Sequence, residues 1–393
     1  MNASSEEKAE TMFNTSTGSG APVPAGVLRM LLPLLTFKAA FFVVALVMVQ
    51  FFSIWDDAEF RKVRRWPPGG ESTLSSRFAT WDAAHYLHIA ENGYRKGDLA
   101  CAFYPLWPAV IKLGSYITGD VFSSGLALAN LFSIAAVLLF WRLVCELSGS
   151  GMATTASTLL LVFPGSLFLS FIYTEALFLF LLASFFLLLL RNNWQGAAIV
   201  GFFLPLTKAV GIFCLAPFVW HWYSQRRPGR EILGVCGPVA GYALYFLVMY
   251  HFTGNPMEGF EAQRNYPTQP SVSKVLDIPL NFRALFFIGD FPASAVDILN
   301  RLFFIVFLVS LPGIWHVNKT LFVYALLAGI IPALSASFYS FVRNVATCLP
   351  MFIGLAFYLQ KNPHPVIRWS LVTAFLGVQL FLLFYYVNAF FAG

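Results

Sequence analysis

Long apolar segments recur along almost the whole chain, and they restrict its fold more than any other feature. A helix needs about 20 apolar residues to cross a bilayer. Only 11% of the residues are charged, whereas a soluble domain is about 25% charged. The chain is therefore predicted to be an all-α polytopic membrane protein. Runs of suitable length and composition cover residues 27–54, 121–145, 152–171, 173–191, 231–252, 298–316, 319–337, 344–360 and 366–390.

Two further apolar segments are interrupted. A proline and a polar Thr-Lys pair divide the run 195–223 into two short helices, 195–206 and 209–223, which meet at one membrane face. Segment 103–118 is short, has Pro105 and Pro108 near its start and contains Lys112. We interpret it as a re-entrant or juxtamembrane helix. The sequence thus predicts about 11 transmembrane helices and one ambiguous segment.

Basic residues predict the orientation, because cytoplasmic loops are enriched in lysine and arginine. With the N-terminus inside, one set of span ends carries nearly all of the basic groups that lie next to spans: Arg29, Lys38, Arg142, Arg191, Arg226, Arg227, Arg230, His316, Lys319, Lys361 and Arg368. The formal charge of +6 is explained by these loops and does not indicate nucleic-acid binding. Residues 1–26 are polar and predicted to form a disordered cytoplasmic tail. Residues 27–393 form the single transmembrane domain.

The opposite face receives the unexpected polar residues. It is predicted to hold a first extracytoplasmic loop, 55–120, with its juxtamembrane helices, and a second long loop, 253–297. The turn before Glu175, the break at Lys208 and the turn that ends in Arg343 also lie there. We therefore expect one face to carry the chemistry and the other to carry the orientation signals.

The stretch "TWDAAHYLHIAENGY" (80–94) is the densest polar segment on that face. On a helix, Asp82, His85 and Tyr86 share one side, whereas His88 and Glu91 lie toward the other. The four titratable groups do not converge on one metal ion, so a divalent metal is possible but not indicated. Two interpretations of Asp82 remain open here: it is a site residue, or it only caps the helix.

Other candidate site residues also have a purely structural interpretation. The aromatic residues of "AFYPLWP" (102–108) suit either a substrate surface or an interfacial belt. Glu175 can cap a helix, and Lys208 can extend to the membrane surface. An acid or a base between apolar spans is nevertheless costly and indicates function. Three cations on the same face as the acids indicate an anionic ligand: Lys208, Arg264 and Arg343.

Several classes of function are disfavoured. The chain has no P-loop, GxGxxG, HExxH or GxSxG pattern in a suitable context, and its apolar runs leave no room for a soluble nucleotide-binding domain. The five cysteines are scattered, without the spacing of a zinc site or a disulfide framework. A donor embedded in the membrane is therefore preferred to a nucleotide sugar.

Five motifs occur in a familiar order: "WDAAHYLHIAENGY", "AFYPLWP", "FPGSLFLSFIYTEALF", "LTKAVGIF" and "TGNPMEGFEAQ". On them, from about residue 78 to 265, the chain resembles the PIG-V-like mannosyltransferases of the GT-C class. The resemblance implies a GT-C-like fold, a large first extracytoplasmic loop and a polyprenyl-phosphate-linked sugar donor, with Asp82 as the loop-1 catalytic acid and Glu175 as a second carboxylate. Where the family usually has Thr-Arg-x-x-Gly, this chain has lysine, Lys208.

The chemistry of such a transfer requires a base for the acceptor proton and cations for the departing phosphate. We assign Asp82 as the base of an inverting reaction, with His85 or Glu175 assisting. We assign the phosphate to Lys208, Arg264 and Arg343, and contacts with sugar or lipid to Trp81, Tyr86, Tyr104 and Trp107.

The expected partners are the lipid-linked donor, a lipid, glycan or protein acceptor, and membrane lipids. The expected location is the plasma membrane in a bacterium or the endoplasmic reticulum membrane in a eukaryote. A transporter or lipid flippase is the main alternative, because a broken helix with charges suits it too. A subunit without catalytic activity is a third.

Overall fold

The computed structural model describes residues 23–54, 60, 63–69, 73–266, 270–287 and 295–392, and these are almost entirely helical. Within them the sole β-type pairing is an isolated antiparallel bridge between Arg65 and Thr80. The prediction of an all-α membrane protein is confirmed. By length and composition, the helices of the described part that can cross a membrane include Arg29–Phe51, Val121–Val162, Gly229–Thr253, Val296–Val317 and Pro365–Val387.

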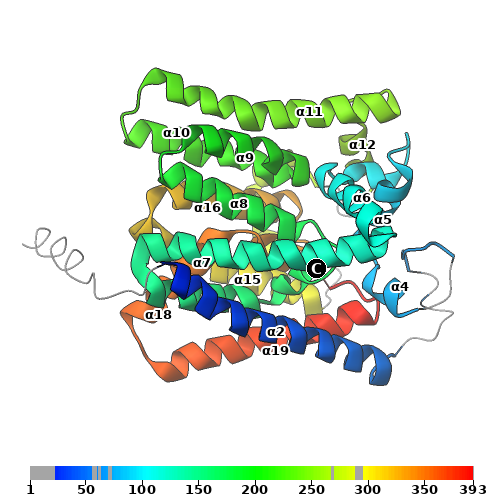
Figure 1. Cartoon of the computed structure of the whole chain (residues 1–393), viewed down its shortest axis with the longest axis horizontal. Coiled ribbons are helices and arrows are strands. Elements are labelled where there is room, and N and C mark those ends of the chain that lie inside the picture. Colours follow the sequence, from blue (N-terminus) through cyan, green and yellow to red (C-terminus); the bar gives the residue numbers. More distant parts are fainter. Residues whose placement is uncertain are drawn as a thin grey trace, which may run out of the picture.

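One set of helices lies side by side as a bundle (Figure 1). They are α2 (Val23–Phe51), α7 (Val121–Val162), α8 (Glu175–Leu190), α9 (Trp194–Thr207), α10 (Leu215–Ser224), α11 (Cys236–Thr253), α15 (Ala295–Val317), α16 (Lys319–Ser335), α18 (Leu349–Lys361) and α19 (Pro365–Val387). Four of the shorter apolar helical segments fall below the usual spanning length, so the total of about 11 spans stays a prediction.

Short elements connect the bundle helices. They are α4 (Leu74–Phe78), α5 (Asp82–Asn92), α6 (Leu106–Thr118), α12 (Glu258–Arg264), α13 (Val272–Val275), α14 (Ile278–Phe286) and α17 (Phe341–Ala346), with the 3₁₀ helices η1 (Leu99–Ala102), η2 (Pro164–Leu169), η3 (Ala209–Cys214) and η4 (Gly229–Val235). The described parts of the predicted loops 55–120 and 253–297 therefore include short helices. Most of the predicted tail, 1–26, lies outside the described residues.

Helix α7 contains the predicted span 121–145 and the start of the predicted span 152–171, separated by a kink. The chain changes direction at Gly149, whose φ of 83° is outside the helical region. The expected span 152–171 is also too long, because the α-helix ends at Val162. Phe163 is extended, as the residue before a proline tends to be, and Pro164 then opens η2. The backbone between Phe163 and α8 is therefore non-α within the bundle.

The break between α9 and α10 agrees with the prediction of two short helices. Lys208 is extended, with φ −152° and ψ 150°, and η3 follows it. Gly211 allows this turn to pack closely, since a Cβ atom there would lie 2.3 Å from the carbonyl group of Leu204. The break holds the Lys208 side chain beside the start of α8.

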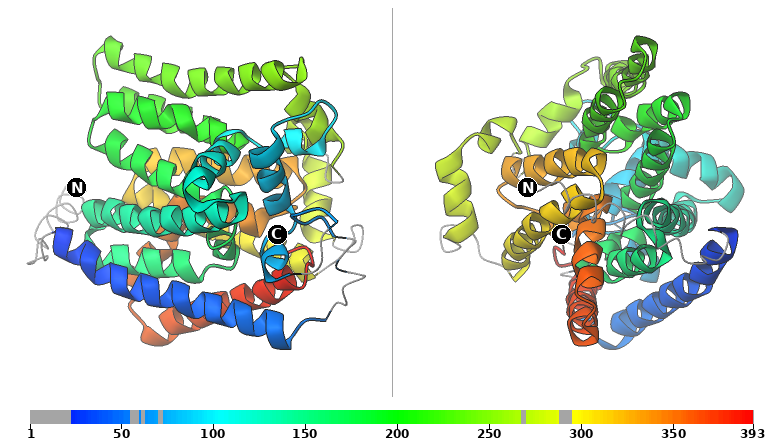
Figure 2. Two further views of the ribbon diagram at one scale, coloured as in Figure 1. Left: turned by 45° about the vertical axis from the view of Figure 1, so that its right-hand side comes forward. Right: turned by 90° about the vertical axis from the view of Figure 1, so that its left-hand side faces the viewer.

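Elements of the two long loops gather at one end of the bundle. Figures 1 and 2 show α4, α5, α6 and α12 at this end, together with the C-terminus, whereas the α10–α11 and α18–α19 connections lie at the other. Helix α6 has 13 residues, which span about 20 Å and fall short of the hydrocarbon thickness. It buries Trp107 and Ile111 and exposes Tyr116 and Ile117. This pattern favours the juxtamembrane interpretation of segment 103–118.

Candidate functional site

Four charged side chains from distant parts of the sequence meet at this end of the bundle. Arg343 Nη2 lies 2.6 Å from Asp82 Oδ2, and Arg343 Nε lies 2.7 Å from Glu175 Oε1. Lys208 Nζ also reaches Glu175 Oε1, at 3.0 Å. We call these four residues the charged cluster. Its two acids and two bases balance, as buried charges must if they are to remain ionised.

The four side chains are not equally accessible. Glu175 is fully buried, Arg343 and Lys208 are 12% and 13% exposed, and Asp82 is 25% exposed. A ligand that enters from solvent would therefore meet Asp82 first and the two cations next. Glu175 lies beneath them, where it can orient both cations but cannot reach a substrate.

Local backbone geometry places Asp82 at the start of α5. The preceding residue, Trp81, has φ 58° and ψ −125°, a conformation that strains any residue other than glycine. The Trp81 amide donates to the carbonyl of Arg64 at 3.0 Å, beside the bridge at Thr80. Helix α5 has no side-chain cap, so the capping interpretation of Asp82 is not what the structure shows. The carboxylate is directed to Arg343 instead.

A second turn places Glu175 and Lys208 together. The Thr174 hydroxyl donates to the carbonyl of Thr207 at 3.3 Å. This bond connects the residue before Glu175 with the residue before Lys208, so the two charged side chains start from adjacent points. Thr174 makes no side-chain cap for α8.

Two aromatic rings support the Arg343 guanidinium. Its Cζ lies 4.9 Å from the centroid of Tyr173 and 5.3 Å from that of Phe168. Such cation–π contacts stabilise a guanidinium and restrict its orientation. The Tyr173 hydroxyl also donates to the Thr80 carbonyl at 3.5 Å, which links this platform to the strand-like segment before Asp82.

His85 belongs to a different group of contacts. Its Nδ1 lies 3.3 Å from Arg64 Nη1, and its Nε2 lies 3.2 Å from the Tyr266 hydroxyl. Burial, followed by the charge of Arg64, lowers the pKa of His85 to about 4, so the ring is neutral at pH 7. Arginine can only donate, hence Nδ1 accepts and Nε2 carries the hydrogen. His85 connects the first loop with Tyr266 of the second loop, and its ring stacks on Phe103 at 4.5 Å.

The remaining titratable groups of α5 face other partners. His88 Nε2 lies 3.2 Å from Asp98 Oδ2, and Glu91 lies 3.9 Å from Lys112. Throughout the described part of the chain, no group of three or more His, Cys, Asp or Glu is arranged to hold a metal ion.

The other predicted contact residues are dispersed. Tyr86 is buried close to Glu175 and Asp82, and Trp81 packs edge-on against Phe391. Tyr104 stacks on Tyr245 at 4.6 Å, and Trp107 is fully buried beside Phe132. Arg264 is exposed at the end of α12. The structure thus brings together the charged cluster and Tyr86, but does not bring Arg264, Tyr104 or Trp107 into it.

Several site residues were not anticipated. Tyr173 and Phe168 lie in the motif that carries Glu175, and their position next to an intramembrane acid was a usable signal. Arg64 and Tyr266 lie in loops where nothing in the sequence distinguishes them from solvated polar residues. The contact of Arg64 with His85 depends on how the first loop folds, and that of Tyr266 depends on how the two loops pack.

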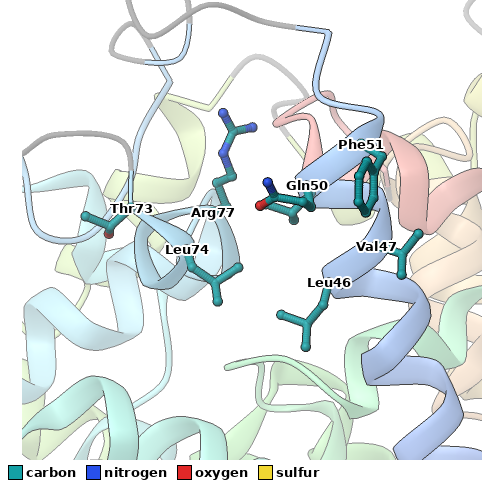
Figure 3. A pocket seen from close by; sticks show the side chains of 8 residues that line it. Leu46, Val47, Gln50, Phe51, Thr73, Leu74 and Arg77 are labelled. Atoms are coloured by element: carbon teal, nitrogen blue, oxygen red, sulfur yellow. The ribbon is translucent and has the colours of Figure 1, made fainter.

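A groove of about 570 Å³ lies away from the charged cluster, between the end of α2 and α4. Figure 3 shows Leu46, Phe51 and Leu74 along it, with the Arg77 guanidinium pointing away from Leu46 and Leu74. No residue of the charged cluster lines this groove. We therefore take the charged cluster, and not the groove, as the candidate functional site.

Comparison with known proteins supports the resemblance over part of the chain. Residues 70–220 match the family model described as mannosyltransferase (PIG-V). This range contains Asp82, Glu175 and Lys208 and ends before Arg343.

Curated relatives match over a similar length. GPI alpha-1,6-mannosyltransferase 2 of Mus musculus is 34% identical over 176 residues, which are 42% of this chain and 35% of that protein. The protein of the same name from Rattus norvegicus is 29% identical over 179 residues, which are 43% of this chain and 36% of that protein. The matches thus span about a third of the length of these relatives. Over residues 70–220, the segment that carries three of the four clustered charges, the chain is PIG-V-like.

Proposed function

We propose that this protein is a membrane-embedded glycosyltransferase. It transfers mannose from a polyprenyl-phosphate-linked donor to an acceptor hydroxyl at the extracytoplasmic face. The family model and the names of the relatives support an enzyme of the glycosyltransferase type and mannose as the sugar. The observation that carries the proposal is the charged cluster, in which a partly exposed carboxylate adjoins two cations.

The cations can bind a donor phosphate without leaving their present partners. A guanidinium has five N–H groups and an ammonium has three. The contacts described above use two groups of Arg343 and one of Lys208. The remaining N–H groups are not used by these contacts and can be donated to phosphate oxygens. Because both cations are largely buried, they would stabilise the negative charge that develops on a departing phosphate.

Asp82 is suited to the acceptor side of the reaction. The acceptor oxygen forms a bond to the anomeric carbon as the bond from that carbon to the phosphate oxygen breaks. The electron pair leaves with the phosphate, and the acceptor proton passes to the Asp82 carboxylate. Attack opposite to the leaving group inverts the anomeric carbon. No general acid is needed, because the phosphate leaves as a stable anion.

Glu175 and His85 act through other residues. Because Glu175 is fully buried beneath Lys208 and Arg343, its role is to hold the two cations at the phosphate position. His85 is occupied on both ring nitrogens by Arg64 and Tyr266, so its role is to join the first loop to the second. Arg264 stays a predicted contact of the donor phosphate. Trp81, Tyr86, Tyr104 and Trp107 stay predicted contacts of sugar or lipid.

A transfer assay tests the proposal. The full chain is purified in lipid nanodiscs and incubated with radiolabelled polyprenyl-phosphate mannose and octyl α-mannoside. The wild type should release polyprenyl phosphate and form a labelled disaccharide. Asp82→Asn keeps the shape of the side chain but removes the base, and we expect a loss of about 10²-fold or more in kcat.

Matched conditions separate the alternatives. Polyprenyl-phosphate glucose replaces the mannose donor in parallel reactions. If wild type and Asp82→Asn are equally active, or if neither transfers any sugar, the catalytic assignment is wrong. In a parallel experiment with sealed proteoliposomes, movement of labelled lipid between leaflets without disaccharide formation would favour the transporter or flippase.

A further inference from the structure

Lys38 is a buried cation that the proposed reaction does not use. It lies midway along α2, fifteen residues after Val23 and thirteen before Phe51, or about 20 Å from either end. Its exposure is 7%. The sequence pattern predicts Lys38 at or near the inner end of the first span as an orientation signal, whereas the structure directs its side chain into the bundle. An ionisable group at this depth is costly and indicates a specific role.

All three partners of the Lys38 ammonium are uncharged. Nζ donates to Asn130 Oδ1 at 3.1 Å, to the carbonyl of Leu169 at 3.0 Å and to the Ser170 hydroxyl at 3.0 Å. The three donors of the ammonium are thus all used. Asn130 completes the group, because its Nδ2 donates to the carbonyl of Ser170 at 3.1 Å.

These contacts lie at a break in helical structure. Helix η2 ends at Leu169, and α8 does not begin until Glu175. Backbone carbonyls in such a break have lost their helical donors, and an apolar environment cannot replace them. Lys38 and Asn130 supply donors to two successive carbonyls, of Leu169 and Ser170. They therefore hold the backbone of the break in one position.

Residues in and next to this break contact the charged cluster. Phe168 precedes Leu169, and Tyr173 follows Ser170. These two rings form the platform beneath Arg343, and the next helix begins with Glu175. We propose that Lys38 is a positioning residue for the transfer site, acting through Leu169 and Ser170 on Phe168, Tyr173 and Glu175. This inference rests on the function proposed above.

Three variants test the inference in the nanodisc assay. Lys38→Met keeps the length of the side chain and removes its donors. Asn130→Ala removes the side-chain contacts of Asn130 with Lys38 and Ser170 but keeps the lysine charge. It replaces Lys38→Met in the test if that variant does not fold. Lys112→Met is the matched control, since Lys112 is 39% exposed on α6 and its nearest acid is 3.9 Å away. A misplacement of the platform should lower kcat/KM about tenfold or more for the first two variants and less than about twofold for the control.

A double variant distinguishes positioning from general destabilisation. If Lys38 acts through Arg343, then Lys38→Met should cause little further loss in a protein that already carries Arg343→Lys. Two independent defects would instead multiply. Multiplied losses, or activities of Lys38→Met and Asn130→Ala within about twofold of wild type, overturn the inference.

Hydrogen exchange supplies a measurement that does not depend on transfer. Amides of 163–175 should exchange about tenfold faster in Lys38→Met and Asn130→Ala than in Lys112→Met. If the wild type transfers no sugar, the proposed function fails, and this measurement alone decides whether Lys38 holds the break. Unchanged exchange in 163–175 then contradicts the positioning role.

Discussion

Arg343 connects the acid that we assign to catalysis with the acid that is buried. Its Nη2 contacts Asp82 and its Nε contacts Glu175, and two aromatic rings lie under the guanidinium plane. A planar fork can make these contacts at once, whereas an ammonium is a compact point charge. The residue type at position 343 therefore matters as much as its charge.

The first prediction concerns Arg343→Lys. The substitution keeps the positive charge but cannot bridge both carboxylates while stacking on Tyr173. We expect kcat/KM for the mannose donor to fall about 10- to 100-fold. Steady-state transfer by the variant measures this, with the exposed Arg95→Lys as control. Retention of full activity by Arg343→Lys would show that charge alone suffices at this position.

A second prediction follows from His85. Burial and Arg64 lower the pKa of His85 to about 4 in the folded protein, against about 6.5 in an unfolded chain. The unfolded state therefore binds more protons between these values, and stability decreases as the pH falls from about 6.5 toward 4. At pH 5 the loss is about 2 kcal/mol relative to pH 7.

Thermal unfolding in detergent at pH 7 and pH 5 checks this sign. The wild type should lose more stability on acidification than His85→Gln, which retains a hydrogen-bonding side chain without a titratable ring. Asp82, Asp98, Arg64 and His88 also act on the ring, and they are unchanged in the comparison. An equal loss in both proteins would exclude His85 as the cause.

At the residue scale, the sequence was informative where a charge interrupts an apolar run. Glu175, Lys208 and Arg343 were identified on that ground, and Asp82 from its motif, and all four meet in space. Their individual roles stay predictions. The contact of His85 with Tyr266 could not be derived, because the two residues are 181 positions apart in different loops. Helical periodicity placed Asp82 and His85 on one side, but it could not show that each has a different partner.

At the element scale, η2 and α17 pack backbone against backbone. A Cβ atom on Gly165 would lie 2.2 Å from the carbonyl oxygen of Val342, the residue before Arg343. Neither backbone can move without displacing a member of the site, since η2 carries Phe168 and α17 carries Arg343. The glycine thus determines the distance between the guanidinium and the ring beneath it.

We therefore expect Gly165→Ala to reduce both activity and stability. The clash involves backbone atoms, so the helices must separate, at a cost of about 1–3 kcal/mol. The matched control is Gly377→Ala in α19, where a Cβ atom meets nothing within 4 Å and the helix should gain up to about 1 kcal/mol. Melting temperature and transfer rate of the two variants provide the test. A Gly165→Ala protein as active as Gly377→Ala would mean that the contact is not close.

The positions of the long helices were largely predictable, because apolar runs of spanning length have few alternatives in a membrane protein. The ends of the predicted runs were less reliable. The run 152–171 was read as one helix although it contains Phe163-Pro164-Gly165, a signal that ends an α-helix. That irregular segment supports the site. Hydropathy alone therefore identified the scaffold and missed the break on which the site depends.

At the scale of the whole molecule, the two ends of the bundle differ in charge and in structure. The charged cluster and the helices α4, α5 and α6 lie at one end, and the α10–α11 and α18–α19 connections lie at the other (Figure 1). The latter connections carry Arg226, Arg227, Arg230 and Lys361, which the positive-inside rule places in the cytoplasm. The proposed transfer then occurs on the extracytoplasmic side.

Cysteine labelling in intact cells tests this orientation. In a background in which the five native cysteines are replaced by serine, Lys96→Cys introduces an exposed thiol near the cluster, and Arg230→Cys introduces one at the opposite end. A membrane-impermeant maleimide should label Lys96→Cys in intact cells and Arg230→Cys only after permeabilisation. The reverse pattern would place the cluster in the cytoplasm, where a donor on the outer leaflet could not reach Arg343. Because bilayer spans fix the two ends on opposite sides, one labelled position determines the other, and labelling of both in intact cells would contradict the described bundle as a membrane-spanning unit.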